Sequence, residues 1–454
     1  MSFRQIVSEI NAVVWGPILL ILLVGTGIFL MFRLRFLPLR NLGHSLRQVF
    51  KRHDKKGKGD ITPFQSLMTA LASTIGTGNI VGVTTAMMLG GPGAIFWMWV
   101  SAIFGLATKY AECMLSVKYR TTNEKGEIAG GPMYVLKNAF PFRRLGKILA
   151  VLFACFAVLA SFGIGNLTQA NSVAVALEGT FSIDPNITGV VLTFLALVII
   201  VGGIQSIGKV SSKIVPIMAA FYIVGGLVVI FSRIQYLPSG IASIVQSAFS
   251  FESMAGGAVG TYFANSLRYG IARGLFSNEA GMGSAPIAAA AAKTDDPVRQ
   301  GYISMTGTFF DTIVVCSITG LIIATSGLIG ATDIEAPVLI AKAFSQALGP
   351  AGEYVVTIGM VLFAFSTILG WSYYGEKSLE FLAGSTKANL VYRIIFCLMV
   401  FVGAIAALDT VWDIAEIFNG LMALPNLICL LVMSGVVVKE TTAYQRRLKI
   451  HKTK

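Results

Sequence analysis

The sequence predicts an all-α polytopic membrane protein with eleven transmembrane helices, and three observations lead to that prediction. The 454 residues are 55% hydrophobic, with a mean hydropathy of +0.75. Only 13% of them are charged, against about 25% in soluble domains. Apolar runs close to the roughly 20 residues that span a bilayer recur along the whole chain.

The predicted spans follow one another along the chain, and only the seventh is ragged. They cover residues 13–32, 64–89, 94–117, 148–175, 187–201, 214–231, a seventh within 249–292, 302–324, 355–373, 390–407 and 414–438. We expect the first span to be a retained helix and not a signal peptide, because it lacks a substantial basic segment before it and a small-residue cleavage site after it.

The distribution of lysine and arginine predicts the orientation. The loops after spans one, three, five, seven and nine are basic, and so is the C-terminal tail. The alternate segments "GGPG", "EGTFSIDPN", "SGLIGATDIEAP" and "LDTVWD" hold no basic residue, and the loop after span six holds only Arg233. By the positive-inside rule the N-terminus is outside and the C-terminus cytoplasmic. This asymmetry also accounts for the net charge of +13, so we expect no nucleic-acid partner.

Cysteine and histidine offer no chemistry to an enzyme. All five cysteines fall in apolar spans without metal-ligand spacing and are expected to be buried: Cys113, Cys155, Cys316, Cys397 and Cys429. The three histidines lie in basic loops or the tail. We therefore predict no catalytic residues, and the sequence shows no filter or charged ring of an ion channel.

A glycine cluster inside span two indicates a break in that helix. The stretch "ASTIGTGNIVGV", residues 72–83, lies mid-membrane, follows a helical segment and has G-x-G-x-x-x-G spacing. A dinucleotide loop needs a preceding strand and a different spacing, so that function is excluded. Helix packing through Gly78 and Gly82 stays open, although it leaves Thr77 and Asn79 unexplained.

Span seven contains a second stretch of the same character, "GLFSNEAGMGSAP", residues 274–286. Spans two and seven each begin a block of five spans, and an odd number gives the second block inverted topology. Paired glycine-interrupted helices in the two halves of an inverted repeat indicate a transporter site. The predicted segments are an extra N-terminal helix 1–33, a basic cytoplasmic loop 34–63, a first repeat 64–232, an inverted second repeat 238–438 and a basic cytoplasmic tail 439–454.

The sequence resembles the alanine or glycine:cation symporter family over nearly its whole length. The motifs that carry the resemblance are "ALASTIGTGNIVGV", "LGGPGAIFWMWV", "ATKYAE", "GGPMY", "GIARGLFSNEAGMGSAPIAAAAAKTDDP" and "DTIVVCSITGL". It implies a LeuT-type 5+5 inverted repeat with one extra helix in front. It further implies uptake of alanine or glycine coupled to Na⁺, in the plasma membrane of a prokaryote.

The resemblance implies two regions that bind sodium. Ser366 and Thr367 resemble the paired hydroxyls of one LeuT-type site, completed by backbone from span two. Ser277 matches a hydroxyl at the other, where Asp311 takes a sodium or gating role. The residues assigned to sodium are Ala72, Ile75, Asn79, Ser277, Asp311, Ser366 and Thr367. For the two hydroxyls of span nine, bonding to the carbonyls of their own helix is the alternative.

The substrate is expected where the two breaks meet. The residues assigned to it are Thr77, Gly78, Asn79, Gln169, Phe276, Glu279, Met282, Thr367 and Trp371. Phe276 would close over the substrate, Gln169 would bind its carboxylate, and Trp371 would narrow the pocket. Gln169 could instead join helices together with Asn166, and Met282 could be core packing.

Acidic residues leave the coupling ion open. Glu279 lies mid-membrane, where a carboxylate is functional by default. It could contact the substrate ammonium, sodium, or a partner such as Arg273. Because Glu279 and Asp311 could also titrate, proton-coupled symport is the alternative. Lys109 and Glu112 are expected to form a structural or inner-gate ion pair.

Overall fold

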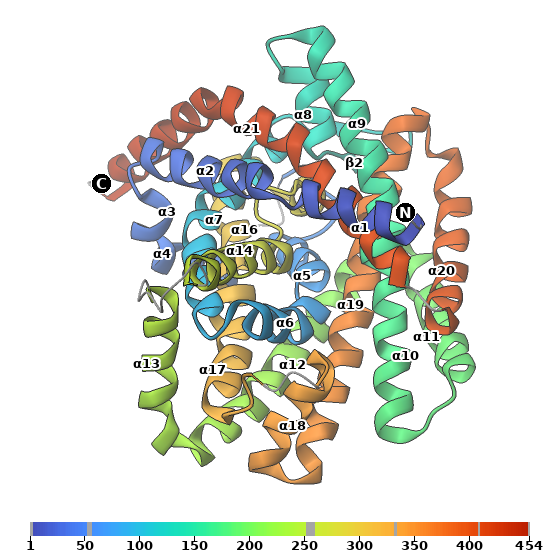
Figure 1. Ribbon diagram of the computed structural model, residues 1–454. Coiled ribbons are helices and arrows are strands. Elements are labelled where there is room, and N and C mark those ends of the chain that lie inside the picture. The colour runs from blue at the N-terminus through green and yellow to red at the C-terminus, as the bar shows by residue number, and fades with distance from the viewer. Residues whose placement is uncertain (1–2, 52–56, 251–258, 331–333, 407–408, 453–454) are drawn as a thin grey trace.

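Helices make up almost all of the regular structure in the computed structural model (Figure 1). The structure describes residues 3–51, 57–250, 259–330, 334–406 and 409–452. The helices and strands before residue 200 are α1 Phe3–Val14, α2 Pro17–Arg33, α3 Leu37–Arg40, α4 Leu42–Phe50, α5 Pro63–Thr74, η1 Thr77–Asn79, α6 Val81–Gly90, α7 Gly93–Lys118, β1 Thr121–Thr122, β2 Ile128–Ala129, α8 Pro132–Ala139, α9 Arg143–Phe162, η2 Gly163–Leu167, α10 Thr168–Phe181 and α11 Pro185–Ile200.

After residue 200, every regular element among the described residues is a helix. They are α12 Gly203–Ser232, η3 Ile234–Tyr236, α13 Leu237–Ala248, α14 Val259–Asn278, α15 Ala285–Ala290, α16 Pro297–Thr308, η4 Phe309–Cys316, α17 Ser317–Ser326, α18 Ala336–Leu348, α19 Pro350–Ala383, η5 Thr386–Ala388, α20 Asn389–Ile405 and α21 Asp409–Lys452.

Membrane-spanning helices account for most of the fold. Within the described residues, eight helices are long and apolar enough to cross a membrane, and the bent pair α5 and α6 makes nine. The predicted fifth span falls on α11, which is apolar but has only 16 residues. The predicted seventh span falls on α14 and α15, which a non-helical segment separates. The chain is therefore a polytopic helical membrane protein.

Two further long helices contain a π-helical turn in place of a break. The turn η2 joins α9 to α10, and η4 joins α16 to α17. Such turns re-aim side chains within a continuous helix and are frequent at functional sites. Both carry polar residues that the sequence assigned to the site or its surroundings.

The broken helices lie at the centre of the molecule. In Figure 1, α6 and α14 run side by side, with α7 beside them. Helix α7 packs against α14, α15 and α16, and α19 packs against α5, α9, α10 and α12. The breaks are thus enclosed by long, straight helices that can hold them in place.

The predicted C-terminal tail 439–454 continues as helix through Lys452 in α21. It packs against the ends of α7 and α16. The Thr441 and Tyr110 hydroxyls lie 2.7 Å apart, and the Tyr444 and Tyr302 ring centroids 6.0 Å apart. The tail is therefore helical and packs against the rest of the protein through Thr441 and Tyr444.

Candidate substrate and ion site

Helix α5 ends at Thr74, and the chain turns by 63° before α6. Gly76 is extended there, and its N–H donates to Oδ1 of Asn79 at 2.9 Å. The Asn79 side chain therefore stabilises the non-helical backbone at Gly76. A side chain at Gly76 would not fit, because its Cβ would lie 2.6 Å from Oγ1 of Thr367. Here glycine is required by the close approach of α19.

The two hydroxyls of α19 face the carbonyl end of α5. Ser366 Oγ lies 3.1 Å from the Ala72 carbonyl oxygen, and Thr367 Oγ1 lies 3.4 Å from that of Ile75. Both hydroxyls lie closer to the Phe363 carbonyl of their own helix, at 2.8 and 3.0 Å.

Each hydroxyl has only one hydrogen, and the shorter distances assign it to Phe363. The bonding to their own helix that the sequence offered as an alternative is therefore present. It leaves two hydroxyl oxygens and two carbonyl oxygens facing one another with free lone pairs. Oxygen ligands of this kind suit a hard cation.

Asp311 on η4 connects the breaks of the two helices. Its Oδ1 accepts a hydrogen bond from Asn79 Nδ2 at 2.8 Å, and its Oδ2 accepts from Ser277 Oγ at 2.9 Å and Thr312 Oγ1 at 2.8 Å. All four residues are buried. Every donor is neutral, and no ion pair to Asp311 occurs among the described residues. When a buried carboxylate has only neutral donors, its negative charge is not compensated, and a bound cation could compensate it.

The second break lies between the end of α14 at Asn278 and the start of α15 at Ala285. Glu279, Gly281 and Gly283 there have φ values of +54°, +89° and +86°. The left-handed conformation is costly for a glutamate, and such strain gathers at functional sites. The glycines adopt it without that cost.

The Glu279 carboxylate is bound by neutral side chains. Its Oε1 accepts from Trp371 Nε1 at 3.1 Å, and its Oε2 accepts from Ser284 Oγ at 2.5 Å. Its backbone oxygen accepts from Lys109 Nζ at 3.0 Å. Arg273, considered above as a partner of Glu279, instead pairs with Glu416 at 2.8 Å. The side-chain partners of Glu279 are therefore the Trp371 indole and the Ser284 hydroxyl.

Gln169 reaches the first break from α10. The Gln169 Nε2 donates to the Ile164 carbonyl at 3.0 Å, whereas its Oε1 is buried and has no partner among the described residues. That oxygen faces the break, since a Cβ on Gly76 would lie 3.5 Å from it. Asn166 turns away and donates to Phe396 of α20, so the two amides do not share a function.

A cavity of about 740 Å³ leads to the first break. It runs from Thr77 and Gly78 past Phe276 to α18 and the start of α19. Gly82 also lines the cavity, and a Cβ added there would meet no atom within 4 Å. Within the described residues no helix packs against Gly82, so the G-x-x-x-G packing hypothesis does not hold at that residue. The cavity provides a route to the polar atoms at the break.

Comparison with known proteins identifies the family. The profile of the sodium:alanine symporter family matches residues 1–454. The chain belongs to the sodium:alanine symporter family. It is 56% identical over 448 residues to the sodium/alanine symporter AgcS of Methanococcus maripaludis, covering 98% of each chain. It is 39% identical to the probable sodium/glutamine symporter GlnT of Bacillus subtilis, over 99% of this chain and 92% of the relative.

The fold is similar to that of solved transporters. The crystal structure of MhsT in complex with L-phenylalanine matches with a TM-score of 0.52 and 12% identity, covering 83% of this chain and 99% of the other. The predicted LeuT-like fold thus has LeuT-like structural neighbours. Together with the family, this makes the chain a sodium-coupled amino-acid symporter and not an enzyme.

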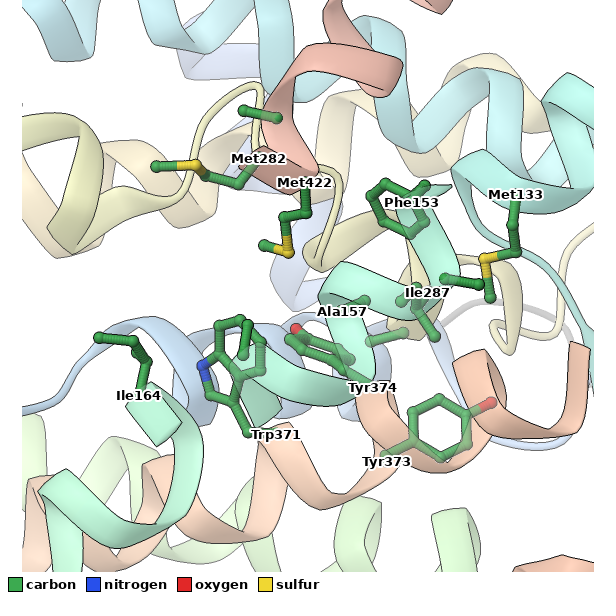
Figure 2. Packing of buried hydrophobic residues seen from close by; sticks show 14 of the residues in the cluster. Met133, Phe153, Ala157, Ile164, Met282, Ile287, Trp371, Tyr373, Tyr374 and Met422 are labelled. Carbon is green, nitrogen blue, oxygen red and sulfur yellow. The ribbon is translucent and has the colours of Figure 1, made fainter. Parts of the chain in front are cut away.

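Within the symporter, the residues assigned to substrate form two groups. Thr77, Gly78 and Phe276 line the cavity. The other assigned residues lie in the protein interior beyond it: Asn79, Gln169, Glu279, Met282, Thr367 and Trp371. Figure 2 shows Met282 beside Met422 and Trp371 beside Tyr374 among buried apolar side chains. A Cβ at Gly165 would collide with Trp371, so that glycine lets the indole approach α9 and α10.

The opposite end of the broken helices is fastened by one arginine. We call the segment 58–61, Arg120 and the segment 290–294 the Arg120 clasp. The Arg120 guanidinium donates four hydrogen bonds of 2.6–2.7 Å to backbone carbonyls of residues 58, 290, 292 and 294. The Lys293 N–H donates to the Ile61 carbonyl at 2.7 Å, in a parallel bridge between the two segments.

The strand pair β1 and β2 connects this end of the symporter to α19. Lys377 of α19 is 1% exposed and pairs with Glu127 at 3.3 Å and Glu380 at 2.9 Å. Asn123 donates to both acids at 3.0 Å. Lys109 and Glu112 pair at 3.5 Å within α7, as the sequence predicted.

Several of these residues were missed by sequence reasoning. Glu416 lines the cavity, and its acidic character in an otherwise apolar span was a usable signal. Arg120 lies in a basic loop, where the positive-inside rule already accounts for it and gives no hint of its partners. Among the described residues, no group of three or more His, Cys, Asp or Glu side chains could hold a metal ion.

Proposed function

We propose that the protein takes up small neutral amino acids, alanine or glycine, together with Na⁺ by alternating access. The single observation that carries the proposal is that Asp311 connects the two broken helices by hydrogen bonds. Its carboxylate holds Asn79 from one broken helix and Ser277 from the other. An ion or substrate bound at either break therefore acts on both helices.

In this proposal the chain has eleven spans, with the N-terminus outside and the C-terminus in the cytoplasm of a prokaryote. Spans two to six and seven to eleven form the two inverted repeats, and α1 with α2 is the extra helix. The cavity then opens to the outside, because α18 follows the acidic loop after span eight. The Arg120 clasp lies at the cytoplasmic end.

We assign one sodium ion to the carbonyls of Ala72 and Ile75 with the hydroxyls of Ser366 and Thr367. Their free lone pairs, described above, support this assignment. A second ion binds near Asp311, with Ser277 and Asn79 as neighbours. The carboxylate there supplies the charge that the neutral donors do not.

The substrate binds between the cavity and the buried residues. The short helix η1, which begins at Thr77 and Gly78 and leads into α6, presents the positive end of a helix dipole to the carboxylate. The free Gln169 Oε1 is an acceptor, so in this proposal it binds the ammonium group, whereas the sequence assigned Gln169 to the carboxylate. Phe276 closes the cavity side, while Glu279 orients Trp371 as a wall that leaves room for a small side chain.

Coupling follows from shared ordering. Sodium at the end of α5 and substrate at the start of α6 both stabilise the same unwound segment. Each ligand therefore binds more tightly when the other is present, and the effect is reciprocal. Thr367 contributes to both, since its hydroxyl lies against the Ile75 carbonyl and against Gly76.

The test is alanine uptake into proteoliposomes with and without an inward sodium gradient, in the wild type and in Thr367→Ala and Gln169→Ala. We expect uptake to require sodium and to fall about tenfold in each variant, as for loss of a buried polar contact. Gly25→Ala is the control, because that residue of α2 has no neighbour within 4 Å of a new Cβ. Undiminished uptake in both variants would overturn the site assignment.

Proton-coupled symport is the second candidate. The observation in its favour is that Glu279 and Asp311 are buried and accept only neutral side-chain donors. A gradient of sodium imposed at equal pH on both sides separates the candidates. Uptake that ignores sodium and follows an imposed pH gradient would replace the sodium proposal with this one.

A further inference from the structure

Three residues form a wall shared by two cavities. A second cavity of about 210 Å³ lies between α1 and α14. Arg273, Phe276 and Glu416 line both this cavity and the large one that reaches the break. We call these three residues the partition. Its arrangement decides whether the two cavities are separate.

The partition is held together by one carboxylate that is shared between two helices. Glu416 Oε1 accepts from Arg273 of α14 at 2.8 Å. Its Oε2 accepts from Asn11 of α1 at 3.0 Å, and its backbone carbonyl accepts from the Trp15 indole at 3.0 Å. The end of α1 thus binds Glu416 through its second carboxylate oxygen and its backbone carbonyl, while Arg273 binds the first oxygen.

Asn11 also relieves a repulsion within α21. Its Nδ2 donates to Asp413 Oδ1 at 3.0 Å, besides its bond to Glu416. Asp413 and Glu416 are three residues apart on one helix, where like charges destabilise each other. An amide NH₂ has two hydrogens and can give one to each acid. A carboxylate or an apolar side chain at position 11 could donate a hydrogen bond to neither Asp413 nor Glu416.

Phe276 connects the partition to the broken helix. Its ring lies 5.4 Å from the Arg273 guanidinium carbon and 6.2 Å from the Trp15 ring. On its other side, a Cβ on Gly78 would lie 3.7 Å from the ring. A change at Trp15 or Arg273 therefore reaches the first break through one aromatic side chain.

From this geometry we propose that α1 is a working part of the outer gate. Asn11 and Trp15 are positioning residues that keep Glu416 where it can receive and release Arg273 as the cavity closes and opens. The inference rests on the proposed function, which places α1 outside the two repeats and requires the cavity to close in each cycle. The extra helix thereby gains a part in transport beyond anchoring.

The experiment compares Asn11→Asp, Asn11→Leu and Trp15→Phe with Ser8→Ala. Ser8 lines the same small cavity, one turn before Asn11, and has no hydrogen bond to Glu416. Two measurements are made on full-length protein in proteoliposomes: the rate of sodium-driven alanine uptake, and equilibrium binding of alanine in sodium. A third is amide hydrogen exchange of residues 413–420.

We expect Asn11→Asp to slow uptake about tenfold while alanine affinity changes less than about threefold. Asn11→Leu and Trp15→Phe should slow it less, and Ser8→Ala should not. Arg273→Gln combined with Asn11→Leu should be no slower than Arg273→Gln alone, because both act through Glu416. Unchanged uptake in Asn11→Asp and Asn11→Leu, or multiplied effects in the double variant, would overturn the proposal.

Hydrogen exchange keeps this test separate from the proposed function. Faster exchange at residues 413–420 in Asn11→Leu, but not in Ser8→Ala, is expected whatever the substrate is. If the wild type neither binds nor takes up alanine, the proposed function fails and the exchange result still decides whether α1 holds Glu416. If Asn11→Leu does not fold, Trp15→Phe, which keeps an aromatic ring and loses the indole N–H donor, decides instead.

Discussion

The two ends of the paired broken helices are built in opposite ways. At the end formed by α5 and α15, Arg120 and the bridge at Ile61 join the two segments through backbone groups. At the end formed by α6 and α14, one face of both helices lines a cavity of about 740 Å³. There, one ion pair among the residues that the structure describes, Arg273–Glu416, joins α14 to α21.

The difference separates two kinds of contact: those that join the broken helices to each other, and those that join them to the surrounding helices. The Arg120 clasp joins segments that belong to the broken helices and to the loop after α7, so it keeps those helices together as one body. The contacts of Lys377 with Glu127, and of Asn123 with Glu380, join that body to α19. In the proposed alternating-access cycle, contacts of the second kind break at the end assigned to the cytoplasm, while contacts of the first kind can persist.

The largest effect is expected from breaking the clasp. Arg120→Ala removes four hydrogen bonds and leaves four carbonyls without this donor. At roughly 0.5–1.5 kcal/mol for each of the four bonds, the loss is about 2–6 kcal/mol of stability. We expect thermal unfolding at lower temperature and sodium-driven alanine uptake reduced at least about tenfold.

Lys125→Ala is the matched control for the clasp, because Lys125 is an exposed cation of the same hairpin. Arg120→Lys should recover only part of the loss, since one ammonium cannot replace a planar fork with five donors. A variant Arg120→Ala that transports at the wild-type rate would mean that the broken helices do not need this fastening.

A smaller effect is expected from filling the open end. Ala341→Trp places a large ring in the cavity wall on α18. Because the Arg120 clasp and the buried residues are untouched, thermal stability should stay the same while the KM for alanine rises about three- to fivefold. Leu398→Trp, on an exposed face of α20, is the control. Unchanged kinetics in Ala341→Trp would show that alanine does not pass through this cavity.

The sequence predicted the breaks better than the ends. Glycines with polar neighbours at residues 76–82 and 279–283 indicate unwound helix, because only backbone that lines a site tolerates this in a membrane. The hydroxyls of Ser366 and Thr367 came from the family resemblance, and the structure brings them to Ala72 and Ile75.

The fastenings could not be predicted, for two physical reasons. Arg120 binds carbonyls, which every residue has, so the partners leave no trace in the sequence. Asn11 and Glu416 are 405 residues apart, and Arg273 and Glu416 are 143 apart. Only the folded chain brings such pairs together, whereas a glycine cluster is local.

The smallest effect is expected at the contact between the β1–β2 hairpin and α19. Glu127→Gln removes the charge that faces Lys377, while Lys377 keeps Glu380. Because Glu127 is partly exposed, the pair is worth only a fraction of a kcal/mol to about 1 kcal/mol, and uptake should change about two- to threefold. Glu124→Gln, an exposed acid of the same hairpin, is the control.

The pH dependence of this contact gives its own test. Burial raises the pKa of Glu127, but the Asn123 hydrogen bond and the Lys377 charge outweigh it and hold the pKa below the ordinary 4.5. A carboxylate with a depressed folded-state pKa contributes stability above its unfolded value, and loses it as pH falls through the folded value. The difference in thermal unfolding between wild type and Glu127→Gln should therefore be constant near neutral pH and shrink once the pH falls below 4.5. A difference that persisted or grew in acid would mean that Glu127 does not hold the hairpin to α19 through its charge.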